Sequence, residues 1–187
     1  GWESGYVLMS SPADAPTLDG KIDNDWRWTN INKTYGKLSE DITIQFYVLH
    51  NVSAIYFAIR VDVATTNNDE SLILYFSKNA SLEEEKAFDK KVVMITNATG
   101  SQNASITAKK DYYRDVDSDE PEAATWIEDT SAVTWNVSVG KTELTYRVYE
   151  FQIPLTPEND QENVKMTIGS QYTIVIGFAR NHELENE

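Results

Sequence analysis

Alternating hydrophobic and polar residues dominate one central stretch of this chain. In Ile42–His50 the even positions are apolar up to the last, so one face of a strand is apolar and the other is mixed. After a short turn at Asn51–Ala54, alternate positions of Ile55–Val61 are apolar again, with Arg60 and Asp62 on the opposite side. Two alternating runs joined by a short turn predict a β-hairpin.

The runs that follow also have the character of strands. Leu72–Phe76 is apolar at both parities, which is typical of a strand that is central in its sheet or covered on two sides. In 144–153 the apolar parity shifts, and a β-bulge near Val148 would explain the shift. We predict further strands at Lys91–Thr96 and Ala104–Ala108 (a hairpin), at Val133–Val139 and at Tyr172–Phe178.

Two stretches break the strand pattern. Ser81 stands three residues before Glu84 as in a capping box, and Leu82–Phe88 consists of helix formers, so we expect one or two helical turns there. Asp111–Glu122 is the most acidic part of the chain, and we expect a loop. The predicted fold is therefore all-β, an antiparallel β-sandwich of jelly-roll or immunoglobulin-like layers with one short helix.

Length indicates one domain preceded by a separable segment. A chain of 187 residues can bury a core of its own. Prolines 12 and 16 separate the first sixteen residues, which contain the strand candidate Gly5–Met9, from a domain at 17–187. This first strand pairs either within its own sheet or with the sheet of a neighbouring subunit by strand addition.

The segment Thr17–Trp28 contains an Asp-Gly turn and two tryptophans of one parity, so at least one indole should be buried. Together with the central hairpin and Tyr149–Leu155, this segment resembles the family-nine carbohydrate-binding modules and the related DOMON and ethylbenzene-dehydrogenase haem-binding domains. The resemblance covers most of the chain and marks a fold rather than an activity. It implies an antiparallel β-sandwich, in agreement with the periodicity.

The chain departs from that family at its end. In that family further strand material usually follows the strand that corresponds to Tyr172–Phe178, and in this sequence we expect none there. A sandwich without its closing strand exposes an edge that must be covered. The assembly strand Tyr6, Val7, Leu8 and Met9 of the same chain would cover it, or that of another subunit, and in the second case the protein would polymerise into a homo-oligomer.

Charge and sequence motifs indicate the compartment. The 30 acidic and 16 basic residues give a net charge of -14, which argues against nucleic acid as a partner, and no apolar run is long enough to span a membrane. The chain opens on Gly1 without an export signal, so we expect that any such signal has been removed. Six Asn-x-Ser/Thr sites and the lack of cysteine favour a secreted, N-glycosylated protein of an archaeal cell surface: Asn32, Asn51, Asn79, Asn97, Asn103 and Asn136.

The chain shows no nucleophile elbow, no phosphate-binding loop and no cysteine, so we expect no enzymatic activity. The alternating carboxylates Asp115, Asp117 and Asp119 offer oxygen ligands at a spacing that calcium favours. The alternative is a simply solvated acidic loop. No other cofactor is expected from the residues themselves.

Two further candidate sites concern ligands. The resemblance to haem-binding relatives implies a Met and His pair on haem b, and Met94 with His182 is the pair to test. For sugar binding, Trp126 and Trp135 flank the acidic loop, with Tyr112 and Tyr113 behind them. Trp135 is alternatively a core residue by parity.

The sequence thus favours a secreted, non-catalytic β-sandwich at the cell surface. The main hypothesis is a structural or adhesive subunit that self-assembles into a filament or surface layer by strand exchange. The alternatives are a carbohydrate-binding module with glycan partners, and a haem b electron carrier.

Overall fold

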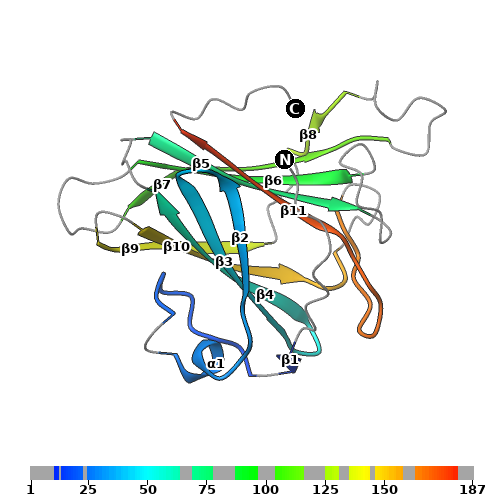
Figure 1. Cartoon of the computed structure of the whole chain (residues 1–187). Helices are drawn as coiled ribbons and strands as arrows, with labels where there is room; N and C mark the ends of the chain where they lie inside the picture. The colour runs from blue at the N-terminus through cyan, green and yellow to red at the C-terminus, as the bar shows by residue number, and fades with distance from the viewer. Residues whose placement is uncertain are drawn as a thin grey trace. The chain divides into compact units, whose positions relative to one another are not determined.

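The computed structural model describes residues 11–12, 14–22, 25–63, 69–77, 87–96, 104–115, 125–130, 135–143, 146–157 and 163–180. Within them the chain is built from two β-sheets and one short helix (Figure 1). The predicted fold class, an all-β antiparallel β-sandwich, is confirmed. Each sheet is the framework of one of two compact units, which are considered separately below.

The first unit contains the six-stranded sheet. Its strands follow the order β1-β3-β4-β10-β9, and β2 pairs with β3 as well. All of these pairings are antiparallel except the parallel pair of β1 with β3. The strands are β1 (Ser11–Pro12), β2 (Thr34–Ser39), β3 (Ile42–His50), β4 (Ala54–Val63), β9 (Asn136–Glu143) and β10 (Tyr146–Pro154).

The second unit contains a five-stranded sheet of order β11-β5-β6-β7-β8. β5 lies between β11 and β6, so the run of apolar residues at both parities does mark a central strand, as predicted. The strands are β5 (Asp69–Ser77), β6 (Ala87–Thr96), β7 (Ser105–Tyr113), β8 (Ile127–Glu128) and β11 (Ile174–Arg180).

The predicted hairpin is confirmed as β3 and β4. The side chain of Asn51 shapes its turn, because Oδ1 of Asn51 accepts hydrogen bonds from the backbone N–H groups of Ser53 and Ala54, each at 2.9 Å. The turn sets the register, which runs from Ile42 opposite Val63 to His50 opposite Ile55. The predicted bulge is also present, as a register shift between β10 and β9 at Tyr146/Val148.

Two local predictions were wrong. Ala87 and Phe88 are not helical but open β6, because both are about 1% exposed and sheet packing outweighs helix propensity. Asp111–Tyr113 are not loop residues but the end of β7, and Asp111 is buried against a buried lysine. Ser81–Lys86 and Val116–Glu122 lie outside the described residues.

The short helix of the described chain is α1 (Trp26–Thr29), in the first unit. Asp25 caps it, since its carboxylate accepts a hydrogen bond from the backbone N–H of Arg27 at 3.0 Å. Trp28 is fully buried and Trp26 is 57% exposed, so one indole is buried as predicted, although on a helix rather than a strand. None of the described helical residues forms a segment of sufficient length and hydrophobicity to cross a membrane.

Each unit has its own apolar cluster. In the first, α1 and the loop before it pack on one face of the sheet around Trp28, whose ring meets that of Tyr47 edge-on at 6.2 Å. In the second, Tyr75 and Val92 are central, and Met94, Tyr112 and Trp126 pack against them. Burying aromatic and branched side chains of this size supplies about 1.5–3 kcal/mol each.

Candidate functional site

One face of the six-stranded sheet carries the polar side chains of two cross-strand rows. Residues in register on neighbouring strands project to the same face of a sheet. One row runs from β2 through β3 to β4 and contains Tyr35, Gln45 and Arg60. The next row contains Lys37, Thr43, Asp62 and Tyr146. We call these seven residues the polar sheet face.

Tyr35 is strongly exposed on this face, with 60% of its surface accessible. The ammonium group of Lys33 lies 5.3 Å from the centre of the Tyr35 ring and 5.7 Å from that of Tyr47. Contacts with the side chains of Tyr35 and Tyr47 raise the pKa of Lys33 above its usual range. An exposed phenol ring and a fully charged ammonium group therefore lie side by side.

Arg60 and Asp62 form a fixed ion pair on the same face. Nε of Arg60 donates to Asp62 Oδ2 at 3.1 Å, and Nη2 donates to Oδ1 at 2.9 Å. The guanidinium plane lies 3.8 Å from the centre of the Tyr146 ring. Two hydrogen bonds and a stacking contact hold this guanidinium group in one orientation on the face.

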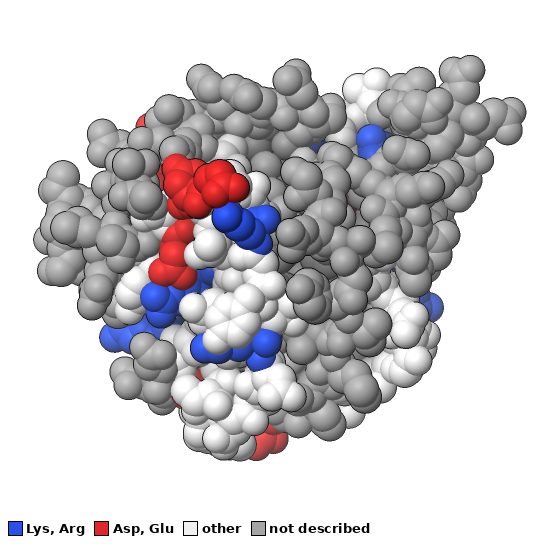
Figure 2. Space-filling view, in the orientation of Figure 1, with Lys and Arg blue, Asp and Glu red and all other residues white. Residues whose placement is uncertain are grey.

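Charges of both signs gather on the described part of the visible surface, with uncharged side chains between them (Figure 2). This mixture contrasts with the net charge of -14 of the whole chain. Lys33 and Lys37 on one side and Asp62 on the other supply both donors and acceptors. A neutral ligand that has many hydroxyl groups and an apolar face matches such a surface better than a highly charged ligand does.

A buried carboxylate anchors the segment that covers the rest of this face. Glu150 on β10 has no exposed surface and accepts hydrogen bonds from Trp28 Nε1 at 2.9 Å and from the backbone N–H groups of Asp19 and Lys21 at 3.1 and 2.9 Å. Burial raises the pKa of Glu150 to about 7; the bond from Trp28 opposes this, and the charge of Asp19 adds to it. Glu150 therefore holds the loop before α1 on the sheet.

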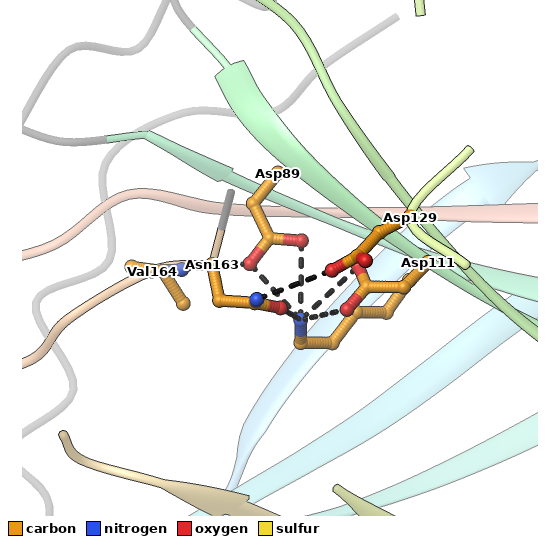
Figure 3. A network of polar contacts seen from close by, with 6 residues as sticks. Asp89, Asp111, Asp129, Asn163 and Val164 are labelled. Atoms are coloured by element: carbon orange, nitrogen blue, oxygen red, sulfur yellow. Dashed lines mark hydrogen bonds and ion pairs between the residues drawn. The ribbon is translucent and has the colours of Figure 1, made fainter. Parts of the chain in front are cut away.

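The second unit contains a buried ion cluster centred on Lys91. Its ammonium group donates to both carboxylate oxygens of Asp89 at 3.0 and 3.1 Å, and to those of Asp111 at 3.2 and 3.3 Å (Figure 3). Oδ1 of Asn163 accepts a further bond from it at 3.3 Å. The side chains of Lys91, Asp89 and Asp111 are at most 5% exposed.

Trp126, one of the predicted sugar-binding residues, is half-buried in the second unit. Its ring lies 4.7 Å from the ammonium of Lys90 and 4.3 Å from the guanidinium of Arg114. The Lys90 ammonium also lies 4.7 Å from the centre of the Tyr112 ring, so Trp126 and Tyr112 contact the same cation. The sequence predicts that these two residues lie near each other. Because Trp126 is half-buried and Tyr35 is 60% exposed, the indole offers less ring surface to a ligand than Tyr35 does.

The prediction for Trp135 as a sugar-binding residue was wrong. Trp135 is 1% exposed and stacks on Phe151 of β10 at 6.1 Å. A buried indole cannot present a face to a ligand. Its alternation with Val137 and Val139, which indicated a core residue, was the better guide.

Several of the other predicted site residues lie outside the described residues. Met94 is half-buried on β6, and its proposed haem partner His182 lies outside the described residues. Asp115 is exposed, Asp117 and Asp119 lie outside the described residues, and no group of three metal-binding side chains forms among those that are described. The assembly strand Tyr6, Val7, Leu8 and Met9 also lies outside them.

The predicted glycosylation sites differ in their surroundings. Asn32 and Asn136 are exposed. Asn51 is half-buried, and its Nδ2 donates to the hydroxyl of Tyr56 at 3.2 Å, so its amide is part of the hairpin turn. Asn79, Asn97 and Asn103 lie outside the described residues.

The polar sheet face was missed in the sequence, although one signal for it was present. Arg60 and Asp62 fall on the polar parity of β4, and Gln45 falls on the mixed parity of β3. What pattern alone does not give is the register, which places Tyr35 beside Gln45 and Arg60.

No protein-family model matches this chain, and no curated protein matches it. Among solved structures, the chain is similar to a family-nine carbohydrate-binding module from Caldicellulosiruptor kristjanssonii in complex with glucose, with 14% identity over 91% of this chain and 74% of that chain and a TM-score of 0.43. A structure of such a module from the same organism in complex with cellotriose has 13% identity over 91% and 73% and a TM-score of 0.41. Both structures belong to the family that the sequence resembles.

Proposed function

We propose that this protein binds carbohydrate through the polar sheet face. The observation that carries the proposal is the exposed ring of Tyr35, in register with Gln45 and Arg60. The apolar face of a pyranose ring stacks on an aromatic ring, and its hydroxyl groups require donors and acceptors beside that ring. The polar sheet face offers both within two cross-strand rows.

The ion pair of this face supports such a role. Arg60 is held by Asp62 and by the Tyr146 ring, so binding a ligand would cost little side-chain entropy. The Lys33 ammonium group lies 5.3 Å from the centre of the Tyr35 ring, and Gln45 is the partner of Tyr35 in register on β3. Both would contact the hydroxyl groups of a sugar stacked there. The ligand class that fits is a neutral oligosaccharide, and we expect no catalytic activity toward it.

A glycan array followed by titration calorimetry with the best-binding oligosaccharide tests this proposal. Tyr35→Ala should weaken binding at least about tenfold, since loss of one stacking contact of about 1.4 kcal/mol or more has that effect. Trp26→Ala is the matched control, because Trp26 is the other strongly exposed aromatic residue among the described residues of this unit, at 57%. Equal affinity of wild type and Tyr35→Ala would contradict the proposal, and loss of binding in Trp126→Ala alone would move the site to the second unit.

A second candidate function is self-assembly by strand exchange. β11 pairs with β5 and is an edge strand of its sheet within the described part of the chain. Its residues Ile174–Ala179 are all half-exposed. An apolar edge strand of this kind accepts an added strand. The apolar segment Tyr6–Met9 of a neighbouring subunit is the strand that we propose for it. Ser11 and Pro12, which follow that segment, pair with β3 of their own chain.

Electron microscopy of material from the native source tests this candidate. Filaments or lattices are expected for the full chain, and monomers are expected after deletion of residues 1–10, which leaves β1 in place. Leu8→Asp should have the same effect as the deletion, while Leu38→Asp, a half-buried position on β2, should not affect assembly. Assemblies that persist in the deletion variant would exclude the mechanism.

Secretion and N-glycosylation belong to the same proposal. Asn32 and Asn136 are exposed and can carry a glycan on the folded protein. Deglycosylation of the native protein should lower its mass, and Asn32→Gln and Asn136→Gln should each remove part of that difference. A native protein with the mass of the bare chain would contradict glycosylation.

A further inference from the structure

The amine of Lys91 and the side-chain amide of Asn163 meet in the buried ion cluster. Nζ of Lys91 donates to Asn163 Oδ1 at 3.3 Å, and the two residues are 72 positions apart in the sequence. Lys91 belongs to β6, and Asn163 begins the described segment that follows β10. An amine next to a carboxamide is a pair that can form an amide bond, if the amine loses its proton and the amide is held in place.

The neighbouring groups hold the Asn163 amide in one orientation. Nδ2 of Asn163 donates to Asp129 Oδ2 at 3.4 Å, which directs Oδ1 toward Lys91 (Figure 3). The next residue, Val164, donates its backbone N–H to Asp89 Oδ2 at 2.8 Å. Asp89 therefore contacts both the lysine and the backbone beside the asparagine. The reacting groups are positioned from both sides before any reaction.

The same cluster contains groups that can move protons. Burial acts to lower the pKa of Lys91, but the charges of Asp89 and Asp111 raise it above its usual range. Burial and the charge of Asp89 raise the pKa of Asp111 to about 8, although Lys91 opposes this. An acid that holds its proton near neutral pH exchanges it readily with a neighbouring amine.

We propose that Lys91 and Asn163 form an intramolecular isopeptide bond. The proton of the Lys91 ammonium passes to the Asp89 carboxylate, which accepts hydrogen bonds from it, and the freed lone pair attacks Cγ of Asn163. The Cγ–Nζ bond forms and the Cγ–Nδ2 bond breaks. The two protons that Nζ loses are carried by the carboxylates of the cluster to the leaving nitrogen, which Asp129 contacts. One ammonium ion leaves and the product is a secondary amide. The reaction is neutral in redox terms and needs no further reactant.

Such a bond would supply a covalent link in a chain that has no cysteine. It would join β6 to the segment at 163–164 and so close a large loop across the second unit. Constraining a long loop restricts the unfolded chain, as a disulfide does. A secreted protein that must persist outside the cell has a use for this link.

Mass spectrometry of the full chain, produced in a bacterial host that adds no glycans, tests the proposal. The intact mass should be lower than the sequence mass by one ammonia molecule. Proteolysis should yield a branched peptide in which fragments containing Lys91 and Asn163 are joined. A succinimide at Asn163 would give the same loss of mass, but it hydrolyses in mild base and yields no branched peptide.

The variants Lys91→Arg and Asn163→Ala should both have the full sequence mass, whereas the matched control Lys165→Arg, at an exposed lysine beside Asn163, should retain the loss. Asp89→Asn should slow or abolish the reaction, which the intact mass follows over time. Wild-type protein with a folded circular dichroism spectrum, the full sequence mass and no branched peptide after prolonged incubation would overturn the proposal, whether or not the variants fold.

Discussion

Each unit contains a site with buried carboxylates, and the two sites differ in the groups that contact those carboxylates. Glu150 is surrounded by neutral donors, namely the Trp28 indole and two backbone N–H groups. Asp89 and Asp111 instead share the ammonium group of Lys91. Neutral donors leave the pKa of Glu150 raised by its burial, whereas the Lys91 ammonium group opposes the rise that burial and the charge of Asp89 cause in the pKa of Asp111. The first arrangement fastens a loop, and the second creates a reactive cluster.

The largest effect that separates the two sites is expected from Lys91→Met. Removing one partner of a buried ion pair leaves uncompensated charge and typically costs about 3–5 kcal/mol. Urea unfolding followed by circular dichroism measures this free energy. Lys165→Met, at an exposed lysine of the same unit, should stay within about 0.5 kcal/mol of wild type. A small effect of Lys91→Met would show that the cluster is already solvated.

The next effect is a dependence of stability on pH. The pKa of Glu150 lies at about 7 in the folded state against an ordinary 4.5, and that of Asp111 at about 8 against 3.8. A raised pKa means that the folded state binds the proton more tightly. The resulting stability is complete below the ordinary pKa and is lost as pH rises through the folded one. The free energy of unfolding should therefore fall between about pH 4 and pH 8.

Substitution separates the two contributions to this pH dependence. Glu150→Gln should roughly halve the slope of the curve between about pH 4.5 and 7, where both groups contribute, and leave the fall between about pH 7 and 8 unchanged, since that fall belongs to Asp111. Asp111→Asn should also reduce the slope below about pH 7, and in addition it should remove the fall between about pH 7 and 8. Thermal unfolding at a series of pH values measures both. A curve that rises over the whole window would show that neither carboxyl holds its proton in the folded state.

The contrast between the units also shows what sequence can and cannot predict. Alternation along Ile42–His50 predicted β3 with its correct bounds, because one apolar face of a strand is a local property. The buried acid Asp111 was assigned to an acidic loop, since its partner Lys91 is 20 residues away and on another strand. The polar sheet face depends likewise on register. Pattern thus predicts strands, whereas contacts between distant residues decide the sites.

A smaller loss is expected from Gly140→Ala, which tests how tightly the loop held by Glu150 lies on the sheet. Gly20, with φ of +75°, lies against Gly140 of β9, and a Cβ on Gly140 would overlap the Gly20 carbonyl group. Overpacking of this kind costs about 1–3 kcal/mol, because backbone on both sides must move. In the second unit, Gly177→Ala meets only side chains at 3.6 Å and should cost less in the same unfolding assay. Equal losses would mean that the loop can lift from the sheet.

The smallest loss of stability is expected from Asp62→Asn. The Arg60–Asp62 pair that it breaks has a contact distance like that of the Lys91–Asp89 pair but is less buried. The Arg60–Asp62 contact is 2.9 Å and the Lys91–Asp89 contact is 3.0 Å, so distance does not distinguish the two pairs. The side chains of Arg60 and Asp62 are each 30% exposed, and water replaces much of what the substitution removes. The loss should be about 0.2–1 kcal/mol and should shrink in high salt, whereas that of Lys91→Met should not. If Asp62→Asn lowers the free energy of unfolding as much as Lys91→Met does, burial is not the cause of the large effect at Lys91. The Arg60–Asp62 pair would then be a structural element of the sheet rather than part of a ligand-binding surface.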